Sequence, residues 1–156
     1  MYNTCLRIVN DTGEAEDIMQ ESFLEAFRQL PNYTAEGTFG SWLKRIVVNR
    51  SLDFLRKTKF TLSIEEEQLD FPETDEPNRE EEMILRVNDV KSAMLQLPDN
   101  YRIILSLFLF EGYDHEEISQ ILNISNQLSR TRYSRARQKL LEILKEKSKY
   151  TSYNYN

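Results

Sequence analysis

An acidic segment divides this chain into two halves. Residues 60–82 contain ten Asp or Glu residues, two prolines and a single basic residue. This composition cannot bury a core and is typical of a charged linker. In a chain of 156 residues it leaves room for two small domains. The alternative role for the segment is an anionic strand that occupies a cationic channel until nucleic acid displaces it.

Both halves favour helix over strand. The whole chain has only four Gly and four Pro. Residues that are common in helices recur throughout: Leu, Ile, Glu, Arg, Lys and Gln. No alternating strand pattern extends beyond a few residues. We therefore expect an all-α fold with two small helical domains, residues 1–59 and 83–150, joined by the acidic linker 60–82.

Charge is distributed in blocks along the chain. The formal net charge is −6, yet residues 38–59 have six basic residues and one acidic residue, and residues 126–156 have eight basic and two acidic. Local field, more than total charge, governs attraction to nucleic acid. The two basic blocks therefore allow an acidic protein to bind DNA in two places.

The first long helix is expected over residues 14–30. Its apolar residues cluster on one side at helical spacing, which predicts the packing face: Ala15, Met19, Phe23, Ala26, Phe27 and Leu30. The opposite side is acidic and has Leu24 at its centre. Two interpretations stay open: a solvated acidic face with one exposed Leu, or a face that docks a partner with Leu24 as its apolar anchor.

A second helix is expected over residues 38–59, with Thr38 as its N-cap. Phe39, Leu43, Ile46, Val47 and Phe54 share one face. Arg45 and Asn49 share another face, together with Leu52 and Arg56, and Trp42 lies at its edge. Arg suits phosphates, Asn suits base edges, and Trp can stack on an unpaired base. A solvated basic face with Trp42 in the core is the alternative.

The C-terminal half ends in a helix-turn-helix pattern. Helices are expected over residues 83–97 and 99–110. Asp114 and Glu117 then form a capping-box start, Asn123 suits the left-handed turn, and Ser125 can cap a long basic helix. One side of that helix is expected to pack on the core: Ser129, Tyr133, Ala136, Leu140 and Ile143. The residues expected to face DNA are Gln127, Arg130, Thr131, Ser134 and Arg135.

A basic helix also occurs as a solvated helix end whose cations interact with the C-terminal dipole. That alternative accounts for Lys145, Lys147 and Lys149. It accounts poorly for Arg130, because a cation in the first two turns opposes the dipole. DNA recognition, in which Arg binds guanine edges, is the interpretation we favour for the first turns of this helix.

Several classes of function are disfavoured by composition. The single Cys5 excludes an internal disulfide, and the single His115 lacks a ligand-spaced partner, so no metal and no cofactor are expected. There is no Gly-rich phosphate loop and no nucleophile–base spacing, so an enzyme is not expected. No apolar run approaches the roughly 18 residues of a membrane span. A cytoplasmic location without membrane insertion is expected.

Two stretches resemble the extracytoplasmic-function (ECF) sigma factors of bacterial RNA polymerase. EAEDIMQESFLEAFRQLPNY followed by FGSWLKRIVVNRSLDFLRK resembles the signature of sigma region 2. LQLPDNYRIILSLFLFEGYDHEEISQILNISNQLSRTRYSRARQKL resembles sigma region 4. The resemblance covers nearly the whole chain apart from the linker, and finding both motifs in this order is highly specific.

The resemblance implies a non-catalytic specificity subunit that binds core RNA polymerase and promoter DNA. The clamp coiled coil of the polymerase would bind Asp17, Gln20, Glu21 and Leu24. The −10 element would be contacted by Trp42, Lys44, Arg45, Asn49 and Arg50. The −35 element would be read in duplex form by Gln127, Arg130, Thr131, Ser134 and Arg135. An anti-sigma factor is a candidate partner.

Two departures from the family pattern shape these expectations. Family members have about one more helix before the residues matching Met1 to Asn10, so the chain is expected to start inside that first helix. The recognition helix opens with Asn126 to Ser129 where the family tends to have Val-Gly-Thr-Val, so the −35 sequence preference does not transfer. The alternative function is a stand-alone helix-turn-helix regulator, which would have no need of the acidic-face helix.

Overall fold

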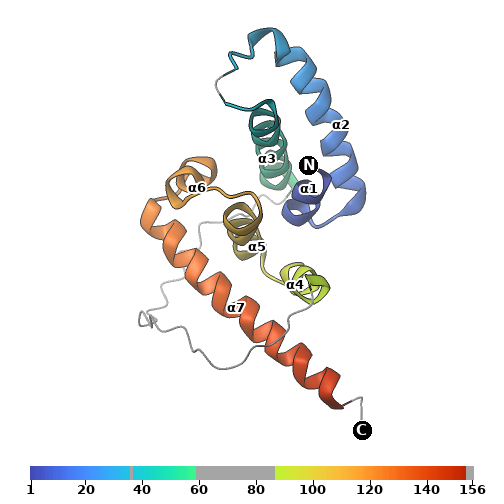
Figure 1. Cartoon of the computed structure of the whole chain (residues 1–156), viewed down its shortest axis with the longest axis vertical. Helices are drawn as coiled ribbons and strands as arrows, with labels where there is room; N and C mark the ends of the chain where they lie inside the picture. Colours follow the sequence, from blue (N-terminus) through green and yellow to red (C-terminus); the bar gives the residue numbers. More distant parts are fainter. Residues whose placement is uncertain (36, 59–86, 154–156) are drawn as a thin grey trace.

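The computed structural model describes residues 1–35, 37–58 and 87–153, with side chains described as far as Lys147. Every regular element in these ranges is helical, which confirms the predicted all-α class (Figure 1). The acidic linker 60–82 and the expected helix start at 83–86 lie outside the described residues.

The first half consists of three helices. These are α1 (Tyr2–Val9), α2 (Thr12–Gln29) and α3 (Phe39–Thr58), with a short 3-10 turn at Leu30–Asn32. Helix α2 runs away from α1, and α3 returns beside it (Figure 1). The Asp11 carboxylate accepts from the Glu14 N–H at 3.0 Å and caps α2. The Thr38 hydroxyl accepts from the Ser41 N–H at 3.2 Å, as an N-cap does.

The second half contains α4 (Val87–Met94), α5 (Asp99–Leu105), α6 (His115–Leu122) and α7 (Asn126–Tyr153). The predicted capping box is present, because Asp114 and Glu117 each accept from the other's backbone N–H. Asn123 adopts the left-handed conformation with φ 55°. The Ser125 hydroxyl accepts from the Leu128 N–H at 3.1 Å. The capping box, the left-handed turn and the Ser125 cap that were predicted for the helix-turn-helix are thus all present.

The helix predicted over 99–110 changes form half-way. After α5 it continues as a π-helical segment, Ser106–Phe110. Here the Glu111 N–H bonds to the Ser106 carbonyl, five residues back, at 3.1 Å. Gly112 then takes φ 76°, which is easy for Gly and strained for other residues. This wider turn sets the position of Glu111 at the end of the helix.

The packing face predicted for α2 is wrong in part. Phe23, Phe27 and Leu30 are 41%, 70% and 46% exposed, whereas Ala15, Ile18, Ser22 and Ala26 are buried. The small side chains of Ala15, Ser22 and Ala26 let α2 lie close to its neighbours. Phe23 and Phe27 therefore remain exposed to solvent. On α3, Phe39 is likewise half exposed, and Leu52, which was expected on the cationic face, is buried.

One continuous apolar core joins the two halves. It contains Cys5, Ile8 and Val9 of α1 together with Ile103 and Ile104 of α5, and most other buried apolar side chains. Helix α1 packs against α2, α3 and α5, and α5 lies between α1 and the long α7 (Figure 1). The predicted packing side of α7 is confirmed, because Ser129, Ala136 and Leu140 are buried and Tyr133 and Ile143 are partly buried.

Candidate functional site

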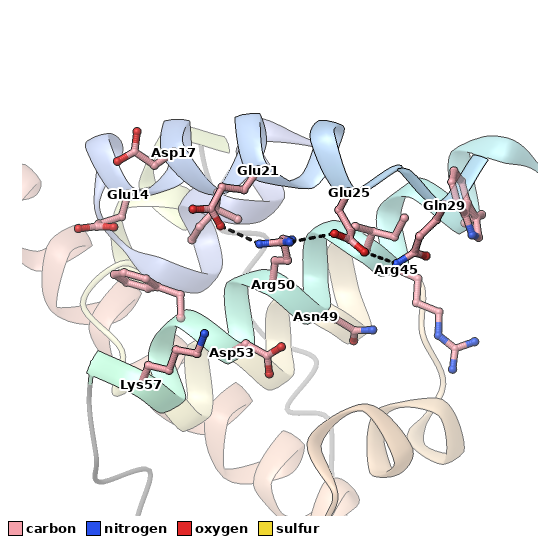
Figure 2. Close-up of a pocket in the computed structure, with 14 residues that line it drawn as sticks. Glu14, Asp17, Glu21, Glu25, Gln29, Arg45, Asn49, Arg50, Asp53 and Lys57 are labelled. Atoms are coloured by element: carbon pink, nitrogen blue, oxygen red, sulfur yellow. Dashed lines mark hydrogen bonds and ion pairs between the residues drawn. The ribbon is translucent and has the colours of Figure 1, made fainter. Parts of the chain in front are cut away.

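A groove of about 760 Å³ runs between α2 and α3. Acidic side chains from α2 line one wall and basic and polar side chains from α3 line the other (Figure 2). The α2 wall is formed by Glu14, Asp17, Glu21, Glu25 and Gln29. The α3 wall includes Trp42, Arg45, Asn49, Arg50 and Lys57. The groove thus brings members of the predicted polymerase-binding set and the predicted −10 set together.

Arg50 crosses this groove. Its guanidinium donates to the Glu21 carboxylate at 2.7 Å and to the Glu25 carboxylate at 3.2 Å (Figure 2). The Gln29 amide also donates to Glu25, at 2.6 Å. The Gln29 hydrogen bond, and after it the Arg50 contact, lower the pKa of the Glu25 carboxyl. Arg50 therefore already has two partners on α2, whereas Arg45 points away from that helix.

The outer face of α2 combines carboxylates with exposed apolar groups. Asp17, Gln20 and Glu21 are exposed, and Leu24 is 57% exposed. Phe27, with 70% of its surface exposed, adds an apolar group that the sequence interpretation had assigned to the core. Large exposed apolar residues grouped on one helix mark interaction sites more often than single ones do. The signal that could have shown this is the Ala15, Ile18, Ser22, Ala26 stripe, which suffices to pack the helix.

An aromatic cluster fixes the start of α3. Tyr33, Phe39 and Trp42 have ring centroids 5.0 to 5.9 Å apart, and the Tyr33 hydroxyl donates to the Gly37 carbonyl at 3.1 Å. Trp42 is partly buried among these rings. Part of the Trp42 ring therefore packs within the protein, and the rest is accessible to solvent.

The remaining predicted −10 residues differ in their surroundings. Arg45 and Asn49 are exposed on α3. Lys44 is partly buried, and its ammonium lies 3.5 Å from the Glu111 carboxylate and 3.3 Å from the Glu111 carbonyl oxygen. The structure thus brings Arg45 and Asn49 to one open surface, while Arg50 and Lys44 contact carboxylates of the chain itself.

The predicted reading face of α7 is open to solvent. Gln127, Arg130, Thr131 and Ser134 are exposed, and Arg135 is partly exposed. Arg130 Nε donates to the Asn126 side-chain oxygen at 2.9 Å, which orients the guanidinium along the helix. Arg132 lies off this face and is partly buried, and burial lowers the pKa of its guanidinium. The five predicted −35 residues thus lie on one side of the first turns of the helix.

His115 connects the two helices of the helix-turn-helix. Its Nδ1 lies 2.9 Å from the hydroxyl of Ser129, which is fully buried. The ring stacks on Phe108 with centroids 4.8 Å apart and meets the edge of Tyr133 at 5.5 Å. Burial, and then the nearby Arg130, lower the pKa of His115. These contacts set the angle at which α7 leaves α6.

In the described ranges, no group of three or more His, Cys, Asp or Glu side chains could hold a metal ion. The described helices also include none that is long and apolar enough to cross a membrane. What the described residues do offer is charge and shape at three places: the α2 face, the α3 face and the first turns of α7.

Helices throughout the described ranges, a helix-turn-helix and exposed arginines on both α3 and α7 are typical of a DNA-binding protein of two parts. Comparison with known families makes this specific, since residues 1–61 match the model of Sigma-70 region 2 and residues 88–140 match that of Sigma-70, region 4. The chain belongs to the ECF sigma factors of RNA polymerase.

Relatives with established names agree with this assignment. The ECF RNA polymerase sigma factor SigM of Bacillus subtilis is 30% identical over 142 residues, covering 90% of this chain and 85% of SigM. The RNA polymerase sigma factor SigZ of the same organism is 34% identical over 137 residues, with 87% and 76% covered. ECF sigma factor SigE of Mycolicibacterium smegmatis is 32% identical over 156 residues. The match to SigE covers 97% of this chain and 60% of SigE.

The fold resembles two solved structures. The sigma factor RpoE in its complex with the anti-sigma factor NepR from Bartonella quintana matches with a TM-score of 0.63 and 22% identity, over 92% of this chain and 89% of RpoE. CnrH in complex with the cytosolic domain of CnrY matches with a TM-score of 0.56 and 20% identity, over 93% of this chain and 80% of the other.

Proposed function

We propose that this chain is a specificity subunit that binds core RNA polymerase and directs it to promoters with defined −10 and −35 elements. The observation that carries the proposal is the presence, in a member of the sigma family, of exposed arginines on one helix of each half, Arg45 on α3 and Arg130 on α7. A stand-alone helix-turn-helix regulator is not favoured, because the first half also matches a sigma region.

The proposed division of labour follows the two halves. Residues 1–59 dock on polymerase and engage the −10 element, residues 60–82 link the halves, and residues 83–150 read the −35 element. The chain acts without catalysis of its own and meets polymerase in the cytoplasm. An anti-sigma factor is a candidate partner, since RpoE is bound to the anti-sigma factor NepR in its solved structure. CnrH is likewise bound to another protein, the cytosolic domain of CnrY.

Polymerase docking is proposed for the outer face of α2. Asp17, Gln20 and Glu21 supply hydrogen-bond acceptors and charge, and Leu24 supplies apolar area. Phe27 extends this surface, because it follows Leu24 by three residues, a spacing that places two side chains next to each other on a helix, and its ring is 70% exposed. An apolar centre with a polar rim is the usual composition of a specific protein interface.

Promoter contacts are proposed for the two cationic faces. At the −35 element, Arg130 and Arg135 would contact base edges or phosphates, with Gln127, Thr131 and Ser134 beside them. At the −10 element, Arg45 and Asn49 are the most accessible candidates. Trp42 sits next to them at the aromatic cluster, and Lys44 and Arg50 would have to exchange their present carboxylate partners for phosphates.

The test is reconstituted transcription. Core polymerase with and without the purified chain is supplied with a library of promoter fragments from the genome that encodes it, and run-off transcripts are sequenced. We expect transcripts that start at a shared promoter type only when the chain is present. Core polymerase that gains no promoter-directed transcript from any fragment would contradict the proposal.

A further inference from the structure

The guanidinium of Arg130, the first arginine of α7, is held by a neighbour on its own helix. Its Nε donates to the side-chain oxygen of Asn126 at 2.9 Å. The two residues are four positions apart, which places their side chains next to each other on the surface of a helix. Asn126 is partly buried and Arg130 is exposed. The more buried residue of the pair therefore orients the more exposed one.

Asn126 is itself held from the other helix of the helix-turn-helix. Its side-chain nitrogen donates to the Glu116 carboxylate of α6 at 3.1 Å, and α6 lies beside the first turns of α7 (Figure 1). An ionised carboxylate only accepts hydrogen bonds, and a guanidinium only donates them. The amide between them must therefore turn its nitrogen to Glu116 and its oxygen to Arg130. The three side chains form a relay, Glu116–Asn126–Arg130, that crosses from α6 to α7.

The Glu116 end of the relay belongs to a well-anchored part of α6. Glu116 lies in the first turn of that helix, between Asp114 and Glu117, which form the capping box. A carboxylate in the first turn is also stabilised by the helix dipole. His115 ties this turn to α7, because its Nδ1 lies 2.9 Å from the buried Ser129 hydroxyl. Contacts outside the relay therefore fix where its first member lies relative to α7.

The relay determines which nitrogens of Arg130 can read a base. An arginine binds the O6 and N7 atoms of guanine through two parallel N–H donors. Because the Nε donor is used by Asn126, the two terminal nitrogens remain to bind guanine. An arginine side chain has much rotamer freedom to lose on binding, and holding the guanidinium before DNA arrives reduces that loss.

We propose that Asn126 is a positioning residue for −35 recognition, and that the relay presents the two terminal nitrogens of Arg130 to a guanine of the −35 element. This rests on the proposed function, since a −35 element matters only for a chain that works with polymerase. Glu116 and Asn126 act through Arg130, so their loss should change the preference at one base pair and leave the phosphate contacts intact. The family tends to have Val at position 126, and a Val side chain can form neither hydrogen bond of the relay.

Selection of duplex DNA by the full chain tests the relay without polymerase. A library with randomised base pairs is bound at low salt, which strengthens phosphate contacts, and the bound duplexes are sequenced. The variant Arg130→Ala identifies the base pair at which the wild type prefers guanine through Arg130. We expect Asn126→Ala to lower the guanine preference at that same base pair about threefold, as for the loss of one hydrogen bond, with the preferences at other base pairs unchanged.

Two further variants and a control separate positioning from folding. Glu116→Gln keeps an oxygen that accepts from Asn126, so the guanine preference should stay at its wild-type value, whereas Glu116→Ala should lower it. Asn88→Ala makes the same change as Asn126→Ala at an exposed position of α4 and should alter no preference. Equal losses at every base pair in Asn126→Ala, no loss at any, or a wild type without a guanine preference that depends on Arg130 would overturn the proposal.

Transcription with core polymerase is measured in parallel on promoters in which the −35 element is varied. A guanine preference that depends on Asn126 in duplex selection, without any promoter-directed transcript, supports the relay and contradicts the specificity-subunit function. Promoter-directed transcription with the same −35 preference for the wild type and for Asn126→Ala supports that function and contradicts the relay.

Discussion

The Arg50 guanidinium on α3 donates to the Glu21 carboxylate on α2 at 2.7 Å, across the groove that separates the two helices. Glu21 belongs to the face proposed to dock on polymerase, and Arg50 belongs to the helix proposed to contact the −10 element. The contact therefore joins the two proposed surfaces of the first half directly. Binding of polymerase to Glu21 would change the charge that Arg50 presents to DNA.

A double-mutant cycle measures this link. Arg50→Ala, Glu21→Ala and the double variant are unfolded by urea, and the coupling free energy is calculated. We expect a coupling of about 0.5 kcal/mol, because both groups are partly exposed and water screens the pair. The control cycle combines Arg50→Ala with Glu16→Ala. Glu16 is also exposed on α2 but is not among the residues that line the groove, so this cycle should give no coupling free energy. Equal values in the two cycles would show that the contact does not form in solution.

Phe27 should contribute to polymerase binding and little to folding. The variant Phe27→Ser is expected to weaken binding to core polymerase about tenfold, or roughly 1.4 kcal/mol, as for a residue at an interface centre. Its free energy of unfolding should hardly change, because the ring is 70% exposed. The control Leu141→Ser alters an apolar residue of α7 that is 42% exposed. Loss of affinity in both variants, or in neither, would argue against α2 as the docking face.

Ser22 offers a test of the packing of α2. Its side chain is fully buried, and the Ser22 hydroxyl oxygen has no hydrogen-bond partner among the described residues. Replacing it with Ala removes a polar group that is costly to bury, so Ser22→Ala should raise the free energy of unfolding by about 1 kcal/mol. Ser51→Ala is the matched control, since that buried hydroxyl donates to the Val47 carbonyl at 2.8 Å. Stabilisation by Ser51→Ala but not by Ser22→Ala would contradict the packing described.

His115 should make stability depend on pH. Burial and Arg130 lower its pKa in the folded chain, so the unfolded chain, with a His pKa of about 6.5, takes up the proton first as the pH falls. The contribution of neutral His115 to the free energy of unfolding is thus fully present above about pH 6.5 and is lost progressively below that pH. Between neutral and mildly acidic pH, the urea midpoint of unfolding should fall further for the wild type than for His115→Gln. An identical fall in both proteins would assign the pH dependence to other groups.

Local signals in the sequence predicted much of this fold. The Asp114–Glu117 capping box, the left-handed Asn123 and the Ser125 cap each depend on residues within a few positions of one another, and all three are present. Helical periodicity also predicted the buried side of α7. Caps and amphipathic stripes are short-range features, so they can be identified without knowing which helices meet.

The errors concern contacts between distant parts of the chain. Periodicity assigned Phe27 to the core, but α2 packs through Ala15 and Ala26, and only the position of its neighbours selects the narrower stripe. Arg50 and Lys44 looked like free cations in the sequence. Their carboxylate partners are 29 and 25 residues away for Arg50 and 67 residues away for Lys44, a separation at which sequence spacing predicts nothing.

The two halves are proposed to bind two elements of one promoter. Footprinting of core polymerase with the chain on a promoter obtained from the transcription library tests this most directly, with Arg130→Ala beside the wild type. We predict protection of both the −10 and the −35 element by the wild type. With Arg130→Ala, protection at −35 should weaken by about 1–3 kcal/mol of binding free energy while the spacing stays the same. A wild-type footprint limited to one element, or a variant footprint indistinguishable from wild type at −35, would contradict the account.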